Sequence, residues 1–206
     1  MKYLAIFSLL FIIGCSQSST TIDDSSSNDT TQSSSNNEGS SSNENSSNIS
    51  SRDIPKISDA KKEAYIEAVN SARADEQNCG GTVYKSTSPL KWSNALYKSS
   101  YEHAQDMDKN SMLEHDGSGK SSDWTAKDLG LNRGSEFDER VIHNGYKHLT
   151  KVSENIARGS SLNTAQKVVD AWLKSPSHCA TLMDPKVKDF GMAKVGDYWS
   201  QDFASQ

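Results

Sequence analysis

The sequence predicts an α+β domain in which helices pack in layers on a sheet. Amphipathic helical patterns occupy most of the folded segment, and two runs of β-type residues about a Gly-containing turn close it. The 206 residues carry a formal net charge of −5 and contain no internal repeat. This length predicts one domain with additional segments, and the acidic balance without a basic aromatic patch excludes nucleic acid as a partner.

Residues 1–14 are predicted to be a lipoprotein signal peptide. A charged start precedes an apolar run, 3–13, that is too short to span a bilayer as a mature helix. The run ends at Gly14-Cys15, and the Ile-Ile-Gly-Cys junction resembles the lipobox of bacterial lipoproteins, in which the cysteine is lipidated. The alternative is an ordinary signal peptide that contains a cysteine. Lipid on Cys15 would anchor the protein to the cell membrane, on its periplasmic or extracellular face. In a Gram-negative source, that membrane is expected to be the outer one.

Residues 15–56 are predicted to be the lipidated cysteine and a disordered tether. Serine, asparagine, threonine and acidic residues fill 16–52, where only Ile22 and Ile49 are apolar. Such a segment cannot bury a core, so we expect one folded domain at 57–206.

Four amphipathic helices are predicted within that domain, each preceded by a capping residue. Their expected N-caps are Ser58, Ser93, Ser135, and Asn163 or Thr164. The first helix should end near residue 74, the third near 144 before a Gly145 stop, and the fourth at 174. Phe137, Val141 and Ile142 are expected on the buried side of the third helix.

The remaining segments are predicted to be loops and strands. Residues 111–132 are rich in Gly, Ser and Asp and should form a loop. Residues 146–157 can pair as a strand, and 190–195 with 198–203 predict a hairpin about Gly196-Asp197. Ser175-Pro176 should turn the chain after the fourth helix and place His178 on a rigid corner.

The three cysteines suggest two different roles. If Cys15 carries lipid, Cys79 and Cys179 remain in an exported chain, where disulfides persist. One bond between them is the simplest interpretation. The alternative is a nucleophilic cysteine acting with a histidine.

Three polar residues on separate turns are candidates for a common site: His115, Glu154 and His178. Two neutral imidazoles and a carboxylate could hold zinc or another divalent cation reversibly, with an open coordination position. The alternative is that Glu154 hydrogen-bonds a histidine and the cleft holds water. His103 shares a helical stripe with Leu96 and Met107, which favours a hydrogen-bonded core residue over a ligand.

The order of several motifs resembles the CAP superfamily of SCP-like extracellular domains, and its bacterial branch most closely. The motifs are Leu90-x-Trp92, His103-Ala-Gln-Asp-Met107, His115-Asp-Gly-Ser118, Gly145-Tyr146, Glu154-Asn-Ile-Ala157, Trp172, Ser175-Pro-Ser-His178 and Tyr198-Trp-Ser-Gln-Asp-Phe203. The resemblance covers about 61–203. It implies a three-layer α-β-α sandwich with a central antiparallel sheet and a cleft lined by two histidines and acids, where some members bind zinc.

Carried onto this chain, the resemblance gives His115, Glu154 and His178 as the cleft residues. Ser175 stands where many eukaryotic members have a second glutamate, and this weakens any hydrolase chemistry that needs all four residues of the family site. No Gly-x-Ser-x-Gly elbow is present.

The sequence therefore favours a membrane-anchored, extracytoplasmic lipoprotein with a non-enzymatic binding domain. Its expected ligand is a small hydrophobic molecule, an envelope component or a protein partner. The alternative function is a metal-dependent hydrolase, a peptidase or esterase, that acts on cell-envelope substrates.

Overall fold

Residues 52–206 are the part of the chain that the computed structural model describes. The predicted signal peptide, Cys15 and most of the predicted tether lie outside the described residues. Within 52–206, no helix is both long and apolar enough to cross a membrane. The elements are α1 (Asp59–Ala74), β1 (Gln77–Cys79), β2 (Thr82–Tyr84), β3 (Lys91–Trp92), α2 (Asn94–Asn110), α3 (Trp124–Asp128), α4 (Phe137–His143), β4 (Lys151–Arg158), α5 (Ala165–Leu173), α6 (Pro176–Leu182), β5 (Asp189–Val195) and β6 (Tyr198–Ser205).

A four-stranded sheet with the order β3-β5-β6-β4 forms the middle of the domain. Strands β5 and β6 pair as the predicted antiparallel hairpin, and β4 pairs antiparallel with β6. The two-residue strand β3 pairs parallel with β5, so the expected antiparallel sheet has one parallel edge. Strands β1 and β2 make a separate small hairpin.

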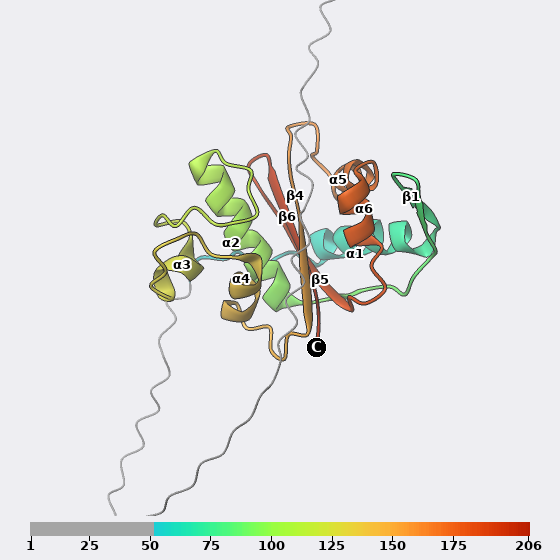
Figure 1. Cartoon of the computed structure of the whole chain (residues 1–206). Helices are drawn as coiled ribbons and strands as arrows, with labels where there is room; N and C mark the ends of the chain where they lie inside the picture. Colours follow the sequence, from blue (N-terminus) through green and yellow to red (C-terminus); the bar gives the residue numbers. More distant parts are fainter. Residues whose placement is uncertain (1–51) are drawn as a thin grey trace, which may run out of the picture. The chain divides into compact units, whose positions relative to one another are not determined.

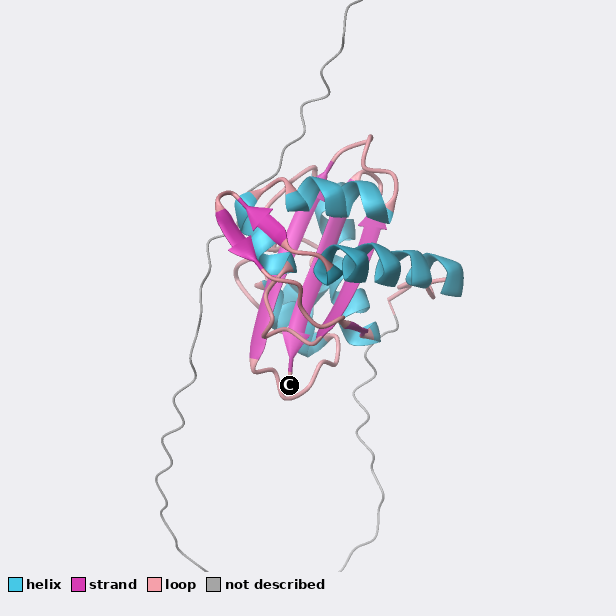
Figure 2. Ribbon diagram, turned by 90° about the vertical axis from the view of Figure 1, so that its right-hand side faces the viewer, coloured by secondary structure: helices cyan, strands magenta, loops and turns pink. Residues whose placement is uncertain are grey.

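Helices cover both faces of this sheet, which confirms the three-layer sandwich. Helices α2, α3 and α4 lie on one side in Figure 1, while α1, α5 and α6 lie on the other. Helix α2 contacts β5 and β6, and α6 contacts β4. Figure 2 looks onto the face that α1, α5 and α6 cover. Every residue of β6 is buried because both of its faces are covered.

Local capping explains most helix starts. Ser58, Ser93 and Thr164 accept hydrogen bonds from the backbone amides of Lys61, Leu96 and Lys167, as the sequence predicts.

Three local predictions are wrong in detail. Helix α4 is capped by Glu136, not Ser135, because Glu136 and Glu139 form a reciprocal capping box. Ile142 is 56% exposed rather than buried. The predicted loop 111–132 contains the short helix α3, which begins where the Asp123 carboxylate accepts a hydrogen bond from the amide of Ala126.

The structure at Ser175-Pro176 also differs from the prediction, which was a turn that places His178 on a rigid corner. Pro176 begins helix α6, where its fixed φ and missing N–H suit the first helical position. His178 therefore lies in the first turn of a helix and is fully buried.

The predicted disulfide between Cys79 and Cys179 is present and joins β1 to α6. Gly80 follows Cys79 with φ of +66°, and a Cβ there would lie 2.5 Å from the Pro176 ring. A side chain at position 80 would therefore push the small hairpin away from α6 and from the disulfide.

Candidate functional site

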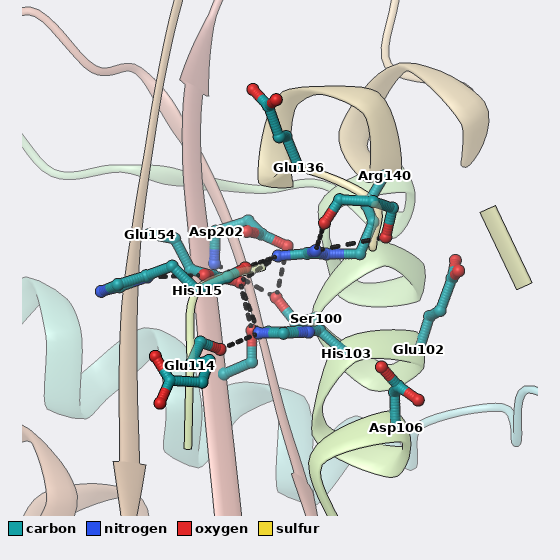
Figure 3. Close-up of polar contacts among 12 residues, drawn as sticks. Ser100, Glu102, His103, Asp106, Glu114, His115, Glu136, Arg140, Glu154 and Asp202 are labelled. Atoms are coloured by element: carbon teal, nitrogen blue, oxygen red, sulfur yellow. Dashed lines mark hydrogen bonds and ion pairs between the residues drawn. The ribbon is translucent and has the colours of Figure 1, made fainter. Parts of the chain in front are cut away.

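Glu154 on β4 is the centre of a buried polar cluster, which we call the Glu154 network (His103, His115, Arg140, Glu154 and Ser200). Its side chain is fully buried. Oε1 accepts a hydrogen bond from Nδ1 of His115 at 2.8 Å, and Oε2 accepts from Nη2 of Arg140 at 3.1 Å and from the Ser200 hydroxyl at 3.2 Å. Both carboxylate oxygens are thus engaged inside the protein (Figure 3).

Arg140 on α4 ties the network to the loop before α3. Besides Glu154, its Nη2 donates to the carbonyl oxygen of His115 at 2.8 Å, and its Nη1 donates to the carbonyl oxygen of Ser135 at 2.6 Å. Burial lowers the pKa of Arg140, but the carboxylates of Glu154, Asp202 and Glu102 outweigh burial and raise it. The guanidinium therefore holds Glu154 and the His115 backbone in one place.

The His115 ring has a defined tautomer when it is neutral. A carboxylate accepts hydrogen bonds, so the proton of the neutral ring is on Nδ1, the atom facing Glu154. The lone pair is then on Nε2. The side chain is 18% exposed. A carboxylate behind one ring nitrogen fixes the ring and makes the other nitrogen a better ligand or base.

His103 on α2 is the core residue that its helical stripe predicts. It is fully buried, and its Nε2 donates to the Glu114 carbonyl oxygen at 2.9 Å. The same nitrogen lies 3.8 Å from Oε2 of Glu154. Burial, reinforced by Arg140, lowers the pKa of His103 to about 4. At neutral pH His103 is therefore an uncharged support for the backbone next to His115.

Glu154 is ionised at neutral pH in this buried environment. Burial raises the pKa of Glu154, but the opposing effects of protonated His103, of Arg140 and of the His115 hydrogen bond lower it to about 2. Because His103 is uncharged at neutral pH, Arg140 is the cation that matters there. Glu154 is therefore an anion fixed in place by a neighbouring cation.

Asp202 on β6 is a second buried carboxylate beside this network (Figure 3). Its Oδ2 accepts a hydrogen bond from the Ser100 hydroxyl at 3.0 Å. Burial and the charge of Glu154 raise the pKa of Asp202 to about 8. Of the two carboxylates, Glu154 carries the negative charge at neutral pH and Asp202 holds a proton.

Two other buried aspartates shape the loop that carries His115. Asp106 on α2 accepts hydrogen bonds from the backbone N–H and the hydroxyl of Ser118, both at 2.7 Å. Asp123 accepts from the amides of Gly119 and Ser135 at 3.0 and 2.9 Å. Burial raises the pKa of Asp123, but the hydrogen bond from the Ser135 hydroxyl at 2.7 Å, together with these amide bonds, outweighs burial and lowers it.

The same loop needs two glycines. The backbones of Gly117 and Gly134 approach so closely that a Cβ on Gly134 would collide with the carbonyl group of Gly117. The loop is therefore held by buried carboxylates and by backbone contact, and the position of His115 follows from both.

His178 lies on the other side of β4 from Glu154. Its Nδ1 is 2.8 Å from the Ser175 hydroxyl, one helical turn earlier on α6. Its carbonyl oxygen accepts a hydrogen bond from Asn155, whose side chain points to the opposite face of β4 from that of Glu154. The pairs His115–Glu154 and Ser175–His178 therefore approach this edge strand from its two faces.

The structure does not fit a three-ligand metal centre. Both oxygens of Glu154 are engaged by other side chains, so this residue fits a carboxylate that orients His115 and not a direct ligand. Among residues 52–206, no group of three or more His, Cys, Asp or Glu residues has the arrangement of a metal site. His115 and His178 are the remaining candidates from the predicted set.

Sequence reasoning missed Arg140 and Ser200 of the Glu154 network and the neighbouring Asp202. Ser200 and Asp202 alternate with Trp199 and Phe203 along β6, and this alternation is the signal that could have placed them on a common face. That face would ordinarily be assigned to solvent, but α2 covers it. Arg140 sits in a short helix beside Val141, and nothing in the local pattern marked it as buried.

Comparison with known proteins agrees with the observed fold. The model of the cysteine-rich secretory protein family (CAP) matches residues 66–204. Among curated proteins, none is significantly similar in sequence.

Two solved bacterial structures share the fold. An extracellular protein containing an SCP domain from Bacillus anthracis superposes with a TM-score of 0.54 at 18% identity, over 74% of this chain and 45% of that protein. An outer surface protein from Borrelia burgdorferi gives a TM-score of 0.50 at 20% identity, over 70% of this chain and 91% of the other. The chain thus spans less than half of the first protein and most of the second.

Proposed function

The chain belongs to the cysteine-rich secretory protein (CAP) family, and from this premise we propose that its folded part is an extracytoplasmic binding domain and not a hydrolase. The observation that carries the proposal is the engagement of Glu154. A general base must reach the proton it removes, directly or through a water molecule. Both oxygens of this fully buried carboxylate are instead bonded to His115, Arg140 and Ser200.

A second observation supports the same conclusion. Ser175 occupies the position where the family resemblance would place a second acid, and it pairs with His178 at 2.8 Å. A serine there supplies no second carboxylate. The expected ligand is a small hydrophobic molecule, an envelope component or a protein partner.

One feature favours the hydrolase as a second candidate. His115 donates from Nδ1 to a carboxylate, and such a pair makes Nε2 more basic. The two functions differ in whether turnover depends on this histidine.

An assay of the mature protein separates the two functions. The protein, with and without added zinc, would be incubated with casein, a mixed peptide library and p-nitrophenyl esters. We expect wild type and His115→Ala to be equally inactive. Zinc-stimulated hydrolysis that His115→Ala abolishes would overturn the proposal in favour of the hydrolase.

A positive test uses native mass spectrometry after incubation with an envelope extract from the source bacterium. A binding domain should retain a defined component, and retention should weaken in His115→Ala if the ligand binds at the Glu154 network. Failure to retain any component would count against the binding function.

We also propose that the domain is tethered to a membrane through lipid on Cys15. The support is the Ile-Ile-Gly-Cys junction followed by a long polar segment. Stable anchoring needs two or more acyl chains, and a lipidated N-terminal cysteine carries them. Wild type should partition into the detergent phase of a Triton X-114 separation, and Cys15→Ala should remain in the aqueous phase. Detergent-phase partitioning of Cys15→Ala would contradict the anchor.

A further inference from the structure

A hollow lies at one end of the sheet, where β6 ends and β5 begins. It is an open pocket of about 400 Å³ whose lining includes the start of α2, the segment after α4, and Gln206. The C label in Figures 1 and 2 marks this end of the sheet. The pocket shares no residue with the Glu154 network, and its volume lies in the range of small-molecule sites, roughly 300–1,000 Å³.

A fixed aromatic wall forms one side of this pocket. The indole of Trp92 packs edge-on against Phe190 with the ring centres 5.4 Å apart, and it lies 5.7 Å from the ring of Tyr97. Its N–H donates to the side-chain oxygen of Asn94 at 2.9 Å. These contacts hold the ring in one orientation, so it can present an apolar surface to a ligand without losing much side-chain entropy.

Hydrogen-bonding groups of both kinds complete the lining. The Tyr146 hydroxyl donates to Oδ2 of Asp189 at 2.7 Å. Burial and this hydrogen bond raise the pKa of Tyr146, so the hydroxyl keeps its proton and orients the carboxylate. Lys147 adds an exposed ammonium group, and Ser93 adds a hydroxyl whose oxygen already accepts the Leu96 amide. The pocket thus offers a charged acceptor and charged and neutral donors within one small space.

We propose that this pocket binds a neutral saccharide unit, with one face of the sugar on Trp92 and its hydroxyls bonded to Asp189 and Lys147. The charges of the lining select against the other ligand classes. An anion would meet the Asp189 carboxylate, and a cation would meet the Lys147 ammonium. An apolar ligand would remove both groups from water without replacing their hydrogen bonds. A sugar has an apolar ring face and hydroxyls that both donate and accept. The site goes beyond the function proposed for the Glu154 network and does not depend on it.

The test is a calorimetric titration of the mature protein in a polyoxyethylene detergent, which carries no sugar. The probes are N,N′-diacetylchitobiose, cellobiose and maltose. We expect at least one of them to bind saturably, and Asp189→Asn and Lys147→Ala each to weaken binding by about tenfold or more, because each loses a charged hydrogen bond. The control Lys167→Ala removes an exposed lysine on α5 and should leave the affinity unchanged.

Three results would overturn the proposal. The first is absence of binding by all three sugars up to about 20 mM, which is the weak end of specific recognition. The second is equal affinity in wild type and Lys147→Ala. Because the Lys147 side chain is exposed, it can be removed without disturbing the fold. This variant therefore tests the proposal even if Asp189→Asn is unstable. The third is that inorganic phosphate or ethanolamine binds saturably in place of the sugars, and that Asp189→Asn or Lys147→Ala abolishes this binding.

Discussion

Nδ1 of His115 donates a hydrogen bond to Oε1 of Glu154 at 2.8 Å, and this contact joins the loop before α3 to the edge strand β4. The other oxygen of the carboxylate faces Arg140 of α4. One buried anion therefore connects a loop, a strand and a helix. Its removal should affect both the stability of the domain and the orientation of the His115 ring.

The first prediction concerns this anion. Glu154→Gln removes the carboxylate that is bonded to the buried Arg140 guanidinium, and breaking a buried pair in this way costs about 3–5 kcal/mol. Urea unfolding at pH 7 should show a loss of that size. Ser200→Ala removes one hydrogen bond from an uncharged donor to the same carboxylate and should cost less, about 1.5–3 kcal/mol. A loss below about 1 kcal/mol for Glu154→Gln would show that the pair is not coupled as described.

The second prediction concerns the pH dependence that His103 imposes. Its pKa falls from the ordinary histidine value of 6.5 to about 4 on folding. Between these values the unfolded chain binds a proton that the folded chain does not, so stability falls as the pH drops from 6.5 toward 4. The contribution is on the order of 3 kcal/mol over this window.

His103→Gln keeps an N–H for the Glu114 carbonyl but cannot take up a proton. Its unfolding free energy should therefore vary less with pH than that of wild type between about pH 6.5 and 4. Identical pH profiles for the two proteins, measured by urea unfolding at half-unit steps, would contradict the neutral state of buried His103.

The third prediction concerns Asp202, whose effect on the pH dependence of stability is opposite to that of His103. Its pKa rises from the ordinary aspartate value of 3.8 to about 8 on folding, through burial and the charge of Glu154. The unfolded chain loses this proton at lower pH than the folded chain does, so the contribution of Asp202 to stability is lost as the pH rises from about 4 to 8. Asp202→Asn cannot ionise.

The melting temperature of Asp202→Asn relative to wild type should therefore increase steadily from about pH 4 to pH 8. The comparison cancels the pH dependence of the groups that Asp202 does not influence. A relative melting temperature that stays constant or decreases over this range would mean that Asp202 is ionised in the folded protein.

The fourth prediction concerns the disulfide. The bond between Cys79 and Cys179 spans 100 residues of chain, and a loop of that length is worth about 4–5 kcal/mol in the chain-entropy model. Dithiothreitol should lower the melting temperature of wild type strongly. The Cys79→Ala, Cys179→Ala double variant should melt at a similarly low temperature and should not respond to the reductant. Two thiols titrating in denatured, unreduced protein would contradict the bond.

Local signals made most of the fold predictable. Ser58, Ser93 and Thr164 cap their helices because the capping geometry depends only on the next three residues. The β5–β6 hairpin followed from alternation about a glycine turn. The cap at Ser135 failed because its hydroxyl bonds to Asp123, a partner 12 residues away, and the competing capping box at Glu136 took its place.

The candidate site was predictable only in part. His115 and Glu154 do meet, as the motifs suggested. The sequence could not assign the role of Glu154, because that role depends on Arg140 and Ser200. These two residues come from α4 and β6, and they are polar residues that a local pattern assigns to the surface. Only packing by α2 and α4 removes them from water, and packing between distant segments has no local signature.

The central claim is that Glu154 orients His115 and is not itself a ligand or base. Zinc titration by calorimetry into wild type, His115→Ala, His178→Ala and Glu154→Gln tests it most directly. We expect zinc to bind wild type more weakly than it binds closed structural sites, and to lose affinity below about pH 6.5, where imidazole is protonated. Each histidine substitution should weaken binding more than Glu154→Gln does, because His115 and His178 are the candidate ligands that remain. Glu154→Gln should weaken binding by only about 10–100-fold, as removal of an orienting carboxylate does. Equal loss in Glu154→Gln and the histidine variants would make Glu154 a direct ligand, and unchanged affinity in the His115→Ala, His178→Ala double variant would remove the metal site altogether.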